Sequence, residues 1–232
     1  MSGASIRIGF VSMRLAGTDG VSLESAKWCR VLSKLGHTCF YFAGESDRPA
    51  ERSLVVPEAH FVHPSVAAIN RDLFHSARVR SRETTDEIHA LRAHLKEQLR
   101  NFVREFEIDL LKVENALSLP MNVPLGLALT ELIAETDIPT IAHHHDFAWE
   151  RSRYIVNAAQ DYLHAAFPPA MPNICHVVIN SYAATELARR TGLRSTVIPN
   201  VMDFEHPPPE STGPLPGLRE ALGLEDGELL LL

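Results

Sequence analysis

No apolar run in the sequence approaches the length of roughly 20 residues that a membrane-spanning helix needs. The apolar run at the amino terminus is also too short for a secretory signal peptide. Cysteine is also scarce: Cys29, Cys39 and Cys175 are widely spaced, each among apolar neighbours. Such cysteines are typical of reduced thiols in a core and not of a disulfide framework. We therefore expect a cytoplasmic protein whose three cysteines are structural.

An excess of basic residues is missing too. Lys and Arg total 22 against 29 Asp and Glu, which gives a formal net charge of -7. Because a surface that binds nucleic acid neutralises phosphates with positive charge, nucleic acid is not an expected partner. The arginine-rich stretch 75–83 leaves contact with a lipid surface open, but a solvated helix face is the favoured interpretation.

The sequence does have a regular alternation of short apolar runs with helical spacing. Apolar runs predict strands at 5–13, 37–45, 60–64, 108–114, 138–146, 175–181 and 194–200. Helical spacing predicts helices at about 21–35, 70–106, 124–136, 149–167 and 182–192. In the first helix Trp28, Val31, Leu32 and Leu35 share one face. This order predicts an α/β fold, with a Rossmann-like parallel sheet covered by helices on both faces.

The composition also predicts how the chain divides. Residues 206–216 are dense in proline and glycine, which is typical of a linker. Residues 217–232 begin a helix and end on an all-leucine strand without partners for its backbone groups. We therefore expect one Rossmann-like domain over 1–205 and the truncated start of a second domain over 217–232.

The first candidate site is the loop after the first predicted strand, where Gly17 and Gly20 flank Thr18 and Asp19. Glycines let a ligand approach the backbone, and amides at the start of a helix point toward a bound anion. A tight turn in which Asp19 or Ser22 caps the helix explains the same residues equally well. The third glycine of the dinucleotide fingerprint is absent, which disfavours an NAD(P)-dependent oxidoreductase.

The second candidate site is the run of three histidines that ends a predicted strand. Alternation along a strand puts His143 and His145 on one face and His144 on the other. A zinc site could use two of them with Asp146, but a further ligand must come from elsewhere, and no His-x-x-x-His or Cys-x-x-Cys pair supplies it. We therefore expect no metal at this position.

Polar and aromatic residues near the histidines suit a polyhydroxy or anionic ligand. His145 can exchange hydrogen bonds with hydroxyls, Trp149 offers an apolar platform, and Glu150 and Arg151 offer charged anchors. A structural alternative makes Glu150 and Arg151 the first turn of a helix. Asn115, just past an earlier strand, is either a cap or a ligand contact.

Taken together, these pieces resemble the amino-terminal half of glycosyltransferase family 4, which has the GT-B architecture of two facing Rossmann-like domains. The resemblance rests on GTDGVSLE at 17–24, HHHDF at 143–147, Ser181 at the start of a helix, and VIPNVMDFE at 197–205. In the last motif Val201 follows the asparagine, where the family usually has glycine.

The resemblance implies retaining transfer of a sugar from a nucleotide-sugar donor to an acceptor hydroxyl, with no metal or other cofactor. It implies that residues 17–20 lie by the donor diphosphate and the acceptor, and that His145 contacts the transferred sugar. The acceptor-side candidates are Asn115, His143, Asp146, Trp149, Glu150 and Arg151. Because the family binds the donor mainly through its second domain, we expect this chain to lack turnover alone.

Other functions stay open at this point. The same domain could be a non-catalytic ligand-binding module, in which case no matching second domain would follow in the natural protein. An NAD(P)-dependent oxidoreductase is disfavoured by the glycine spacing, and a metal-dependent hydrolase built on the histidines is disfavoured by the missing ligand.

Overall fold

The computed structural model describes residues 4–75, 77–202, 204 and 222–225. The chain divides into two units, Met1–Asn200 and Val201–Leu232. The expected linker at 206–216 lies outside the described residues. Of the expected second-domain segment 217–232, the structure describes only 222–225, a turn at Gly223.

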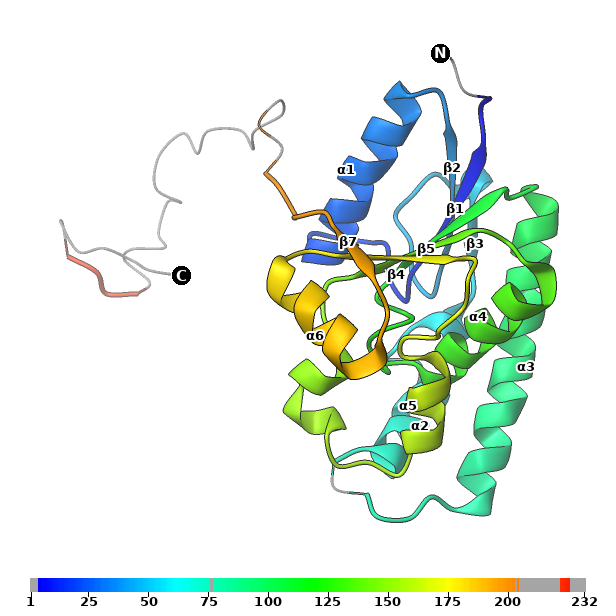
Figure 1. Cartoon of the computed structure of the whole chain (residues 1–232), viewed down its shortest axis with the longest axis vertical. Helices are drawn as coiled ribbons and strands as arrows, with labels where there is room; N and C mark the ends of the chain where they lie inside the picture. The colour runs from blue at the N-terminus through cyan, green and yellow to red at the C-terminus, as the bar shows by residue number, and fades with distance from the viewer. Residues whose placement is uncertain (1–3, 76, 203, 205–221, 226–232) are drawn as a thin grey trace. The chain divides into compact units, whose positions relative to one another are not determined.

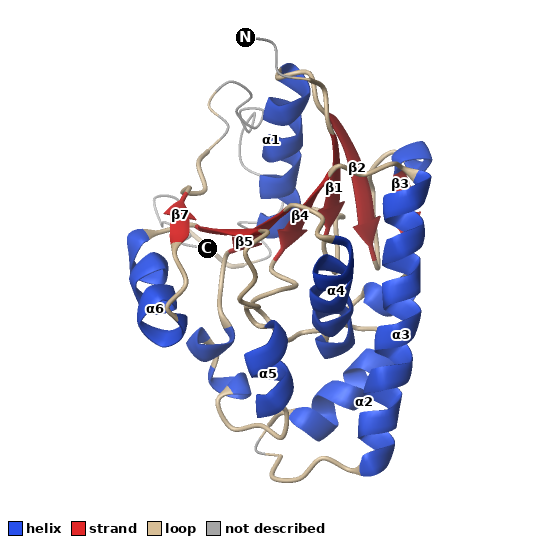
Figure 2. Ribbon diagram, turned by 45° about the vertical axis from the view of Figure 1, so that its right-hand side comes forward, coloured by secondary structure: helices blue, strands red, loops and turns tan. Residues whose placement is uncertain are grey.

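The first unit is built on one parallel sheet (Figures 1 and 2). Its strands are β1 (Arg7–Val11), β2 (Thr38–Ala43), β3 (Ser53–Val55), β4 (Leu110–Glu114), β5 (Thr140–His144), β6 (Ile174–Val178) and β7 (Ser195–Val197). They lie in the order β3-β2-β1-β4-β5-β6-β7. The direction of the order reverses between β1 and β4, and such a switch point opens a crevice at the carboxyl ends of the strands. The predicted Rossmann-like α/β fold is confirmed.

Helices lie on both faces of the sheet, as predicted (Figure 2). The helices are α1 (Gly20–Lys34), α2 (Pro64–Leu73), α3 (Arg82–Glu105), α4 (Val123–Thr136), α5 (Gln160–Ala166) and α6 (Ser181–Thr191), with 3-10 turns η1 (Ala50–Arg52), η2 (Pro57–Ala59), η3 (Ala148–Glu150) and η4 (Ser152–Tyr154). Helix α1 packs on the side of the sheet where Ile8 and Phe10 point. Helices α3 and α4 pack on the other side, against Val11 and Val113.

Helix α3 buries an apolar stripe, in which Leu95, Leu99 and Phe102 are fully buried. Helix α1 differs from the prediction: Val31 and Leu35 are exposed. Trp28 and Leu32 pack against the core on this side of the sheet, and the buried residues of α1 lie in its first turns. Those residues are Ser22, Glu24 and Ser25.

Two other predicted elements are wrong. The strand expected at 60–64 is absent, and the edge strand is β3, whose three residues pair with β2. Pro57 starts the turn η2 there and leads the chain out of the sheet. The helix expected at 149–167 is broken into η3, η4 and α5, because Arg151 has an extended backbone between the two turns (φ -119°, ψ 111°).

The cysteine prediction holds only in part. All three thiols are free; Cys39 is buried, Cys29 is half-buried and Cys175 is exposed. Cys175 lies on β6 and points to the α1 side of the sheet, because His176 and Val178 point to the other side. No described helix covers β6 on the α1 side, which is why this thiol meets solvent.

None of the described helices combines the length and apolar character that crossing a membrane requires.

Candidate active site

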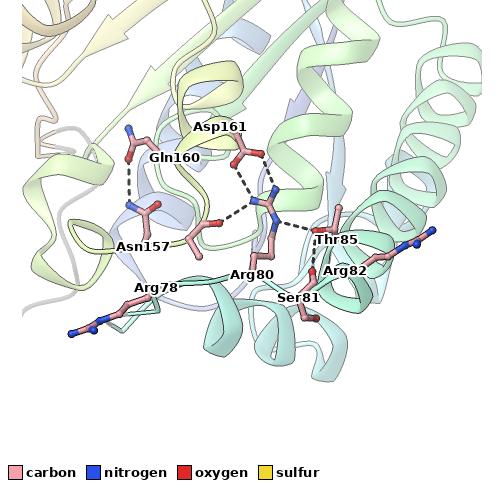
Figure 3. A pocket seen from close by; sticks show the side chains of 9 residues that line it. Arg78, Arg80, Ser81, Arg82, Thr85, Asn157, Gln160 and Asp161 are labelled. Carbon is pink, nitrogen blue, oxygen red and sulfur yellow. Dashed lines mark hydrogen bonds and ion pairs between the residues drawn. The ribbon is translucent and has the colours of Figure 1, made fainter.

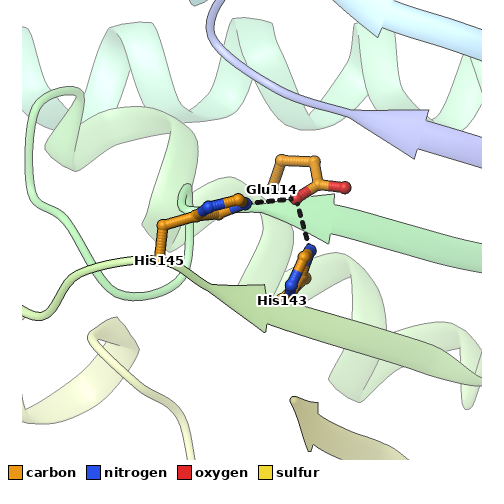
Figure 4. Close-up of side chains that lie close together, drawn as sticks. All are labelled: Glu114, His143 and His145. Atoms are coloured by element: carbon orange, nitrogen blue, oxygen red, sulfur yellow. Dashed lines mark hydrogen bonds and ion pairs between the residues drawn. The ribbon is translucent and has the colours of Figure 1, made fainter. Parts of the chain in front are cut away.

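The carboxyl ends of β4 and β5 bring one carboxylate and two imidazoles together (Figure 4). Glu114 is the last residue of β4 and pairs in register with His143 on β5. Its Oε2 lies 2.9 Å from His143 Nδ1 and 3.3 Å from His145 Nε2. His143 and His145 thus share a face, whereas His144 points to the opposite side and meets His176. This alternation is as the sequence predicts.

A buried lysine lies beneath this cluster. Lys112 is fully buried on β4, and its ammonium bonds Glu114 Oε1 and lies 3.2 Å from His143 Nδ1. It also lies over the Trp28 ring, 4.4 Å from the centroid. Together, Lys112, Glu114, His143 and His145 form the Glu114 cluster.

The charges of the Glu114 cluster follow from burial and pairing. Burial by itself would raise the pKa of Glu114, but Lys112 and hydrogen bonds from the two histidines outweigh it and hold this pKa well below its ordinary value. Burial lowers the pKa of Lys112, against the opposing effect of Glu114. Burial also lowers the pKa of His143, against Glu114 again. We therefore treat Lys112 and Glu114 as an ion pair and His143 as neutral.

Glu114 is the further potential metal ligand that could not be identified from the sequence. One ligand atom from each of Glu114, His143 and His145 lies within 4.8 Å of the other two. The Lys112 ammonium, however, already bonds the same carboxylate and lies next to His143 Nδ1. A divalent cation there would meet a buried like charge at close range, which disfavours metal binding.

Asn115 holds the backbone of this site in place. It has left-handed dihedrals (φ 57°), and its Oδ1 accepts a hydrogen bond from the His145 amide at 2.8 Å. Its own amide donates to the His143 carbonyl. Asparagine tolerates this backbone conformation better than most residues. Its side-chain oxygen thus positions His145.

The outer side of His145 meets Asn200. Asn200 Nδ2 lies 3.2 Å from His145 Nδ1, and the His145 side chain is 9% exposed. Sequence reasoning missed Asn200, Glu114 and Lys112 as site residues. Lys112 had left one signal, a charged residue inside an apolar strand; Glu114 and Asn200 each end a predicted strand.

The glycine loop follows β1 and starts α1. Gly17 has left-handed dihedrals (φ 75°) and its amide donates to Asp47 Oδ2 at 2.8 Å. Asp19 is the N-cap, accepting hydrogen bonds from the amides of Val21 and Ser22. Thr18 and Gly20 are exposed, and a Cβ on Gly20 would meet nothing within 4 Å.

The loop and the Glu114 cluster share one region. β1 and β4 are neighbours in the parallel sheet, so the glycine loop and the end of β4 lie at the same edge. Helix α1 reaches the cluster directly through Trp28, whose ring lies 5.5 Å from that of His143.

The other candidate residues are engaged differently. Asp146 Oδ2 accepts a hydrogen bond from Arg151 at 2.5 Å. Glu150 accepts from the Phe147 amide at 2.7 Å, which is the first-turn role that the structural alternative assigns to it. Trp149 stacks on Phe147, with ring centroids 4.4 Å apart, and lines a cavity of about 720 Å³ beside α5 and α6. The Phe147 ring in turn contacts His144, so this aromatic pair belongs to the other side of β5.

Arg78, Arg80 and Arg82 of the arginine-rich stretch line a second cavity, of about 570 Å³ (Figure 3). Arg80 bonds both carboxylate oxygens of Asp161, at 2.9 and 2.8 Å, and the Ala158 carbonyl. It therefore ties this stretch to α5. The expected solvated helix face begins only at Arg82, where α3 starts.

Comparison with known proteins identifies the fold's relatives. No protein-family model matches the chain. The mannosylglucosylglycerate synthase of Thermotoga maritima is 35% identical over 206 residues, which cover 87% of this chain and 46% of that protein. The synthase of the same name from Petrotoga mobilis is 32% identical over 211 residues, covering 86% and 46%. The chain is homologous to the GT4-like retaining glycosyltransferases.

The relationship to GT4-like glycosyltransferases covers part of those proteins. The chain spans about half the length of the curated relatives it matches. The sucrose-phosphate synthase structure from Thermosynechococcus elongatus superposes with a TM-score of 0.55 at 10% identity, covering 95% of this chain and 53% of that one. That likeness shows the fold alone: the sheet matches the GT-B amino-terminal domain. The resemblance noted in the sequence is confirmed.

Proposed function

We propose that this chain is the acceptor-side domain of a retaining glycosyltransferase, which moves a sugar from a nucleotide-sugar donor to an acceptor hydroxyl. The observation that carries the proposal is the match to two mannosylglucosylglycerate synthases over most of this chain. The convergence of the glycine loop and the Glu114 cluster at the switch point of the sheet supports it, because such crevices bind ligands.

The groups at this edge suit sugar transfer. The exposed start of α1, with open space at Gly20, leaves room for a diphosphate to approach the loop, where Asp19 already accepts from the amides of Val21 and Ser22. The His145 side chain is 9% exposed, and its outward nitrogen fits a sugar hydroxyl. In such a reaction the protein mainly positions the substrates and stabilises charge on the departing diphosphate. We assign donor-loop roles to residues 17–20 and sugar contact to His145.

The remaining candidates have less direct support. Asn115 and His143 act on this ligand through His145 and Glu114. Asp146, Glu150 and Arg151 form the exposed rim beyond β5 and stay acceptor-side candidates. Trp149 faces the cavity beside α5 and α6 and would contact only an acceptor long enough to reach around the end of β5.

The relatives' name also suggests the product. We propose that the complete protein forms mannosylglucosylglycerate or a closely similar glycoside. In this proposal residues 1–205 form the acceptor-side domain, 206–216 a linker, and 217–232 the start of the donor-binding domain. The chain on its own would bind acceptor without turnover.

The test is a transfer assay with the complete protein and, in parallel, the 232-residue chain. Nucleotide-activated mannose and glucosylglycerate are the substrates, and NMR of the product reports the anomeric configuration. We expect product with retained configuration from the complete protein and none from the chain. Turnover by the 232-residue chain alone would contradict the proposal that it binds acceptor without turnover. A complete protein that binds acceptor but transfers no sugar from any nucleotide donor would favour the non-catalytic module.

A further inference from the structure

The two ring nitrogens of His145 face different partners. Nε2 points inward to Glu114 Oε2, at 3.3 Å, and Nδ1 points outward to Asn200 Nδ2, at 3.2 Å. Glu114 is fully buried, and its only charged neighbour of opposite sign is Lys112 among the described contacts of this cluster. Glu114, the inward partner, therefore has much less freedom to change its hydrogen-bonding role than Asn200, the outward partner.

The chemistry of the partners determines which nitrogen carries the proton. An ionised carboxylate only accepts hydrogen bonds, so the nitrogen that faces it must be the N–H. The Asn200 amide nitrogen only donates, so the nitrogen that faces it must present a lone pair. Both contacts require the same neutral form of His145, with the proton on Nε2. The carboxylate can keep this role only while it stays ionised, and in this fully buried place the Lys112 ammonium is what keeps it so.

We propose that Lys112 is a positioning residue: its ion pair with Glu114 fixes His145 in the Nε2–H form, so that Nδ1 offers a lone pair to the active site. A ligand group that takes the place of the Asn200 amide must then be a hydrogen-bond donor. A sugar hydroxyl meets this requirement, whereas a carboxylate or phosphate does not. The ligand part of this inference rests on the proposed function; the protonation pattern does not.

The protonation pattern can be measured on the chain itself. Protonated and unprotonated imidazole nitrogens have well separated ¹⁵N shifts, and His145→Gln identifies the signals of this ring. At neutral pH we expect a protonated Nε2 and an unprotonated Nδ1 for His145. A protonated Nδ1 with an unprotonated Nε2 would overturn the proposal, and it would do so whether or not the complete protein transfers sugar.

The role of Lys112 needs a variant that still folds. Lys112→Met alone leaves the buried Glu114 carboxylate without a counter-ion. The test therefore uses the double variant Lys112→Met with Glu114→Gln, which keeps the side-chain sizes and removes both charges. A glutamine amide can donate or accept, so we expect the Nε2–H form of His145 to lose its dominance. An unchanged protonation pattern would show that the ion pair does not determine which ring nitrogen of His145 carries the proton.

Asn200→Ala is the matched control. It removes the outward partner and leaves Lys112 and Glu114 in place, so the Nε2–H form should persist. A switch of the proton to Nδ1 in this variant would assign control to Asn200 and contradict the proposal.

The ligand part is tested by binding in the complete protein. Deoxyfluoro analogues of the mannose donor and of glucosylglycerate replace one hydroxyl at a time by fluorine, which cannot donate a hydrogen bond. We expect one position to lose about tenfold in affinity, the equivalent of one hydrogen bond. That loss should disappear in His145→Ala. Equal affinity for all the analogues would refute a hydrogen bond donated by a substrate hydroxyl to His145. Failure of the unmodified substrates to bind would instead refute the proposed function.

Discussion

His144 and His176 join β5 to β6 through a hydrogen bond in the interior of the protein: Nε2 of the first lies 2.9 Å from Nδ1 of the second. Both rings are buried, and they stack with centroids 5.2 Å apart. One nitrogen must donate and the other accept, which requires at least one neutral ring. Burial lowers the pKa of His176 to about 4, which the nearby Pro169 carbonyl opposes only in part, and burial lowers the pKa of His144 well below its ordinary value.

This pair predicts acid sensitivity of the fold. Between pH 6.5 and 4 an unfolded chain binds protons on these histidines that the folded chain does not, so the free energy of unfolding falls as the pH is lowered. The stabilisation is fully present above about pH 6.5 and is lost toward pH 4. For His176 alone we expect a loss on the order of 3 kcal/mol over this range. Urea unfolding at closely spaced pH values measures it.

A variant separates this pair from the general effect of acid. His176→Asn keeps a hydrogen-bonding group for His144 but cannot take up a proton, so the slope of unfolding free energy against pH should become shallower. His164→Ala, on the exposed side of α5, is the control and should keep the wild-type slope. Equal slopes for all three proteins would show that His176 is not the titrating group.

Much of the fold can be predicted from the sequence because each central strand is a short apolar run and each crossover has helical spacing. The same period-two alternation correctly predicts that His143 and His145 share a face. The edge strand β3 escapes this reasoning, since its three residues are only partly buried and have no distinct pattern. The exposed Val31 and Leu35 show the limit of helical periodicity, because the spacing predicts a stripe but does not say which of its residues the sheet covers.

The site is less predictable because its contacts come from strand register. Glu114 and His143 meet only because β4 and β5 pair with these two residues side by side, 29 positions apart in the chain. No local pattern specifies that pairing. Asn200 reaches His145 from beyond β7, 55 positions away, for the same reason.

Substitution of the two loop glycines should have different effects: on stability at Gly17 and on ligand binding at Gly20. Gly17 has left-handed dihedrals, so Gly17→Ala should destabilise the fold by about 1 kcal/mol. Gly20 has ordinary helical dihedrals and open space beside it, so Gly20→Val should change stability by under about 0.5 kcal/mol. In the complete protein Gly20→Val should instead weaken binding of the nucleotide sugar, because the valine side chain would occupy the proposed path of the diphosphate. Thermal unfolding and calorimetric titration check the two effects, and a stable Gly20→Val protein with wild-type affinity would remove Gly20 from the donor loop.

The buried ion pair predicts strong non-additivity. Lys112→Met leaves Glu114 charged and without a counter-ion, which should cost about 3–5 kcal/mol of unfolding free energy. The double variant with Glu114→Gln should be more stable than Lys112→Met, since no lone charge is buried. A double-mutant cycle by urea unfolding measures the coupling, and additive effects would contradict a paired Lys112 and Glu114.

His145 is the residue on which the catalytic proposal depends most. In the complete protein His145→Ala should lower kcat by roughly one to three orders of magnitude if, as proposed, this side chain contacts the reacting sugar. Its removal should leave the fold nearly intact, since Glu114 keeps Lys112 and His143 as partners. His94→Ala, at a side chain on α3 that is 43% exposed, is the control and should keep the wild-type rate. A loss of stability that matches the loss of activity would reduce His145 to a structural role, whereas a folded variant with an unchanged rate would exclude it from the reaction.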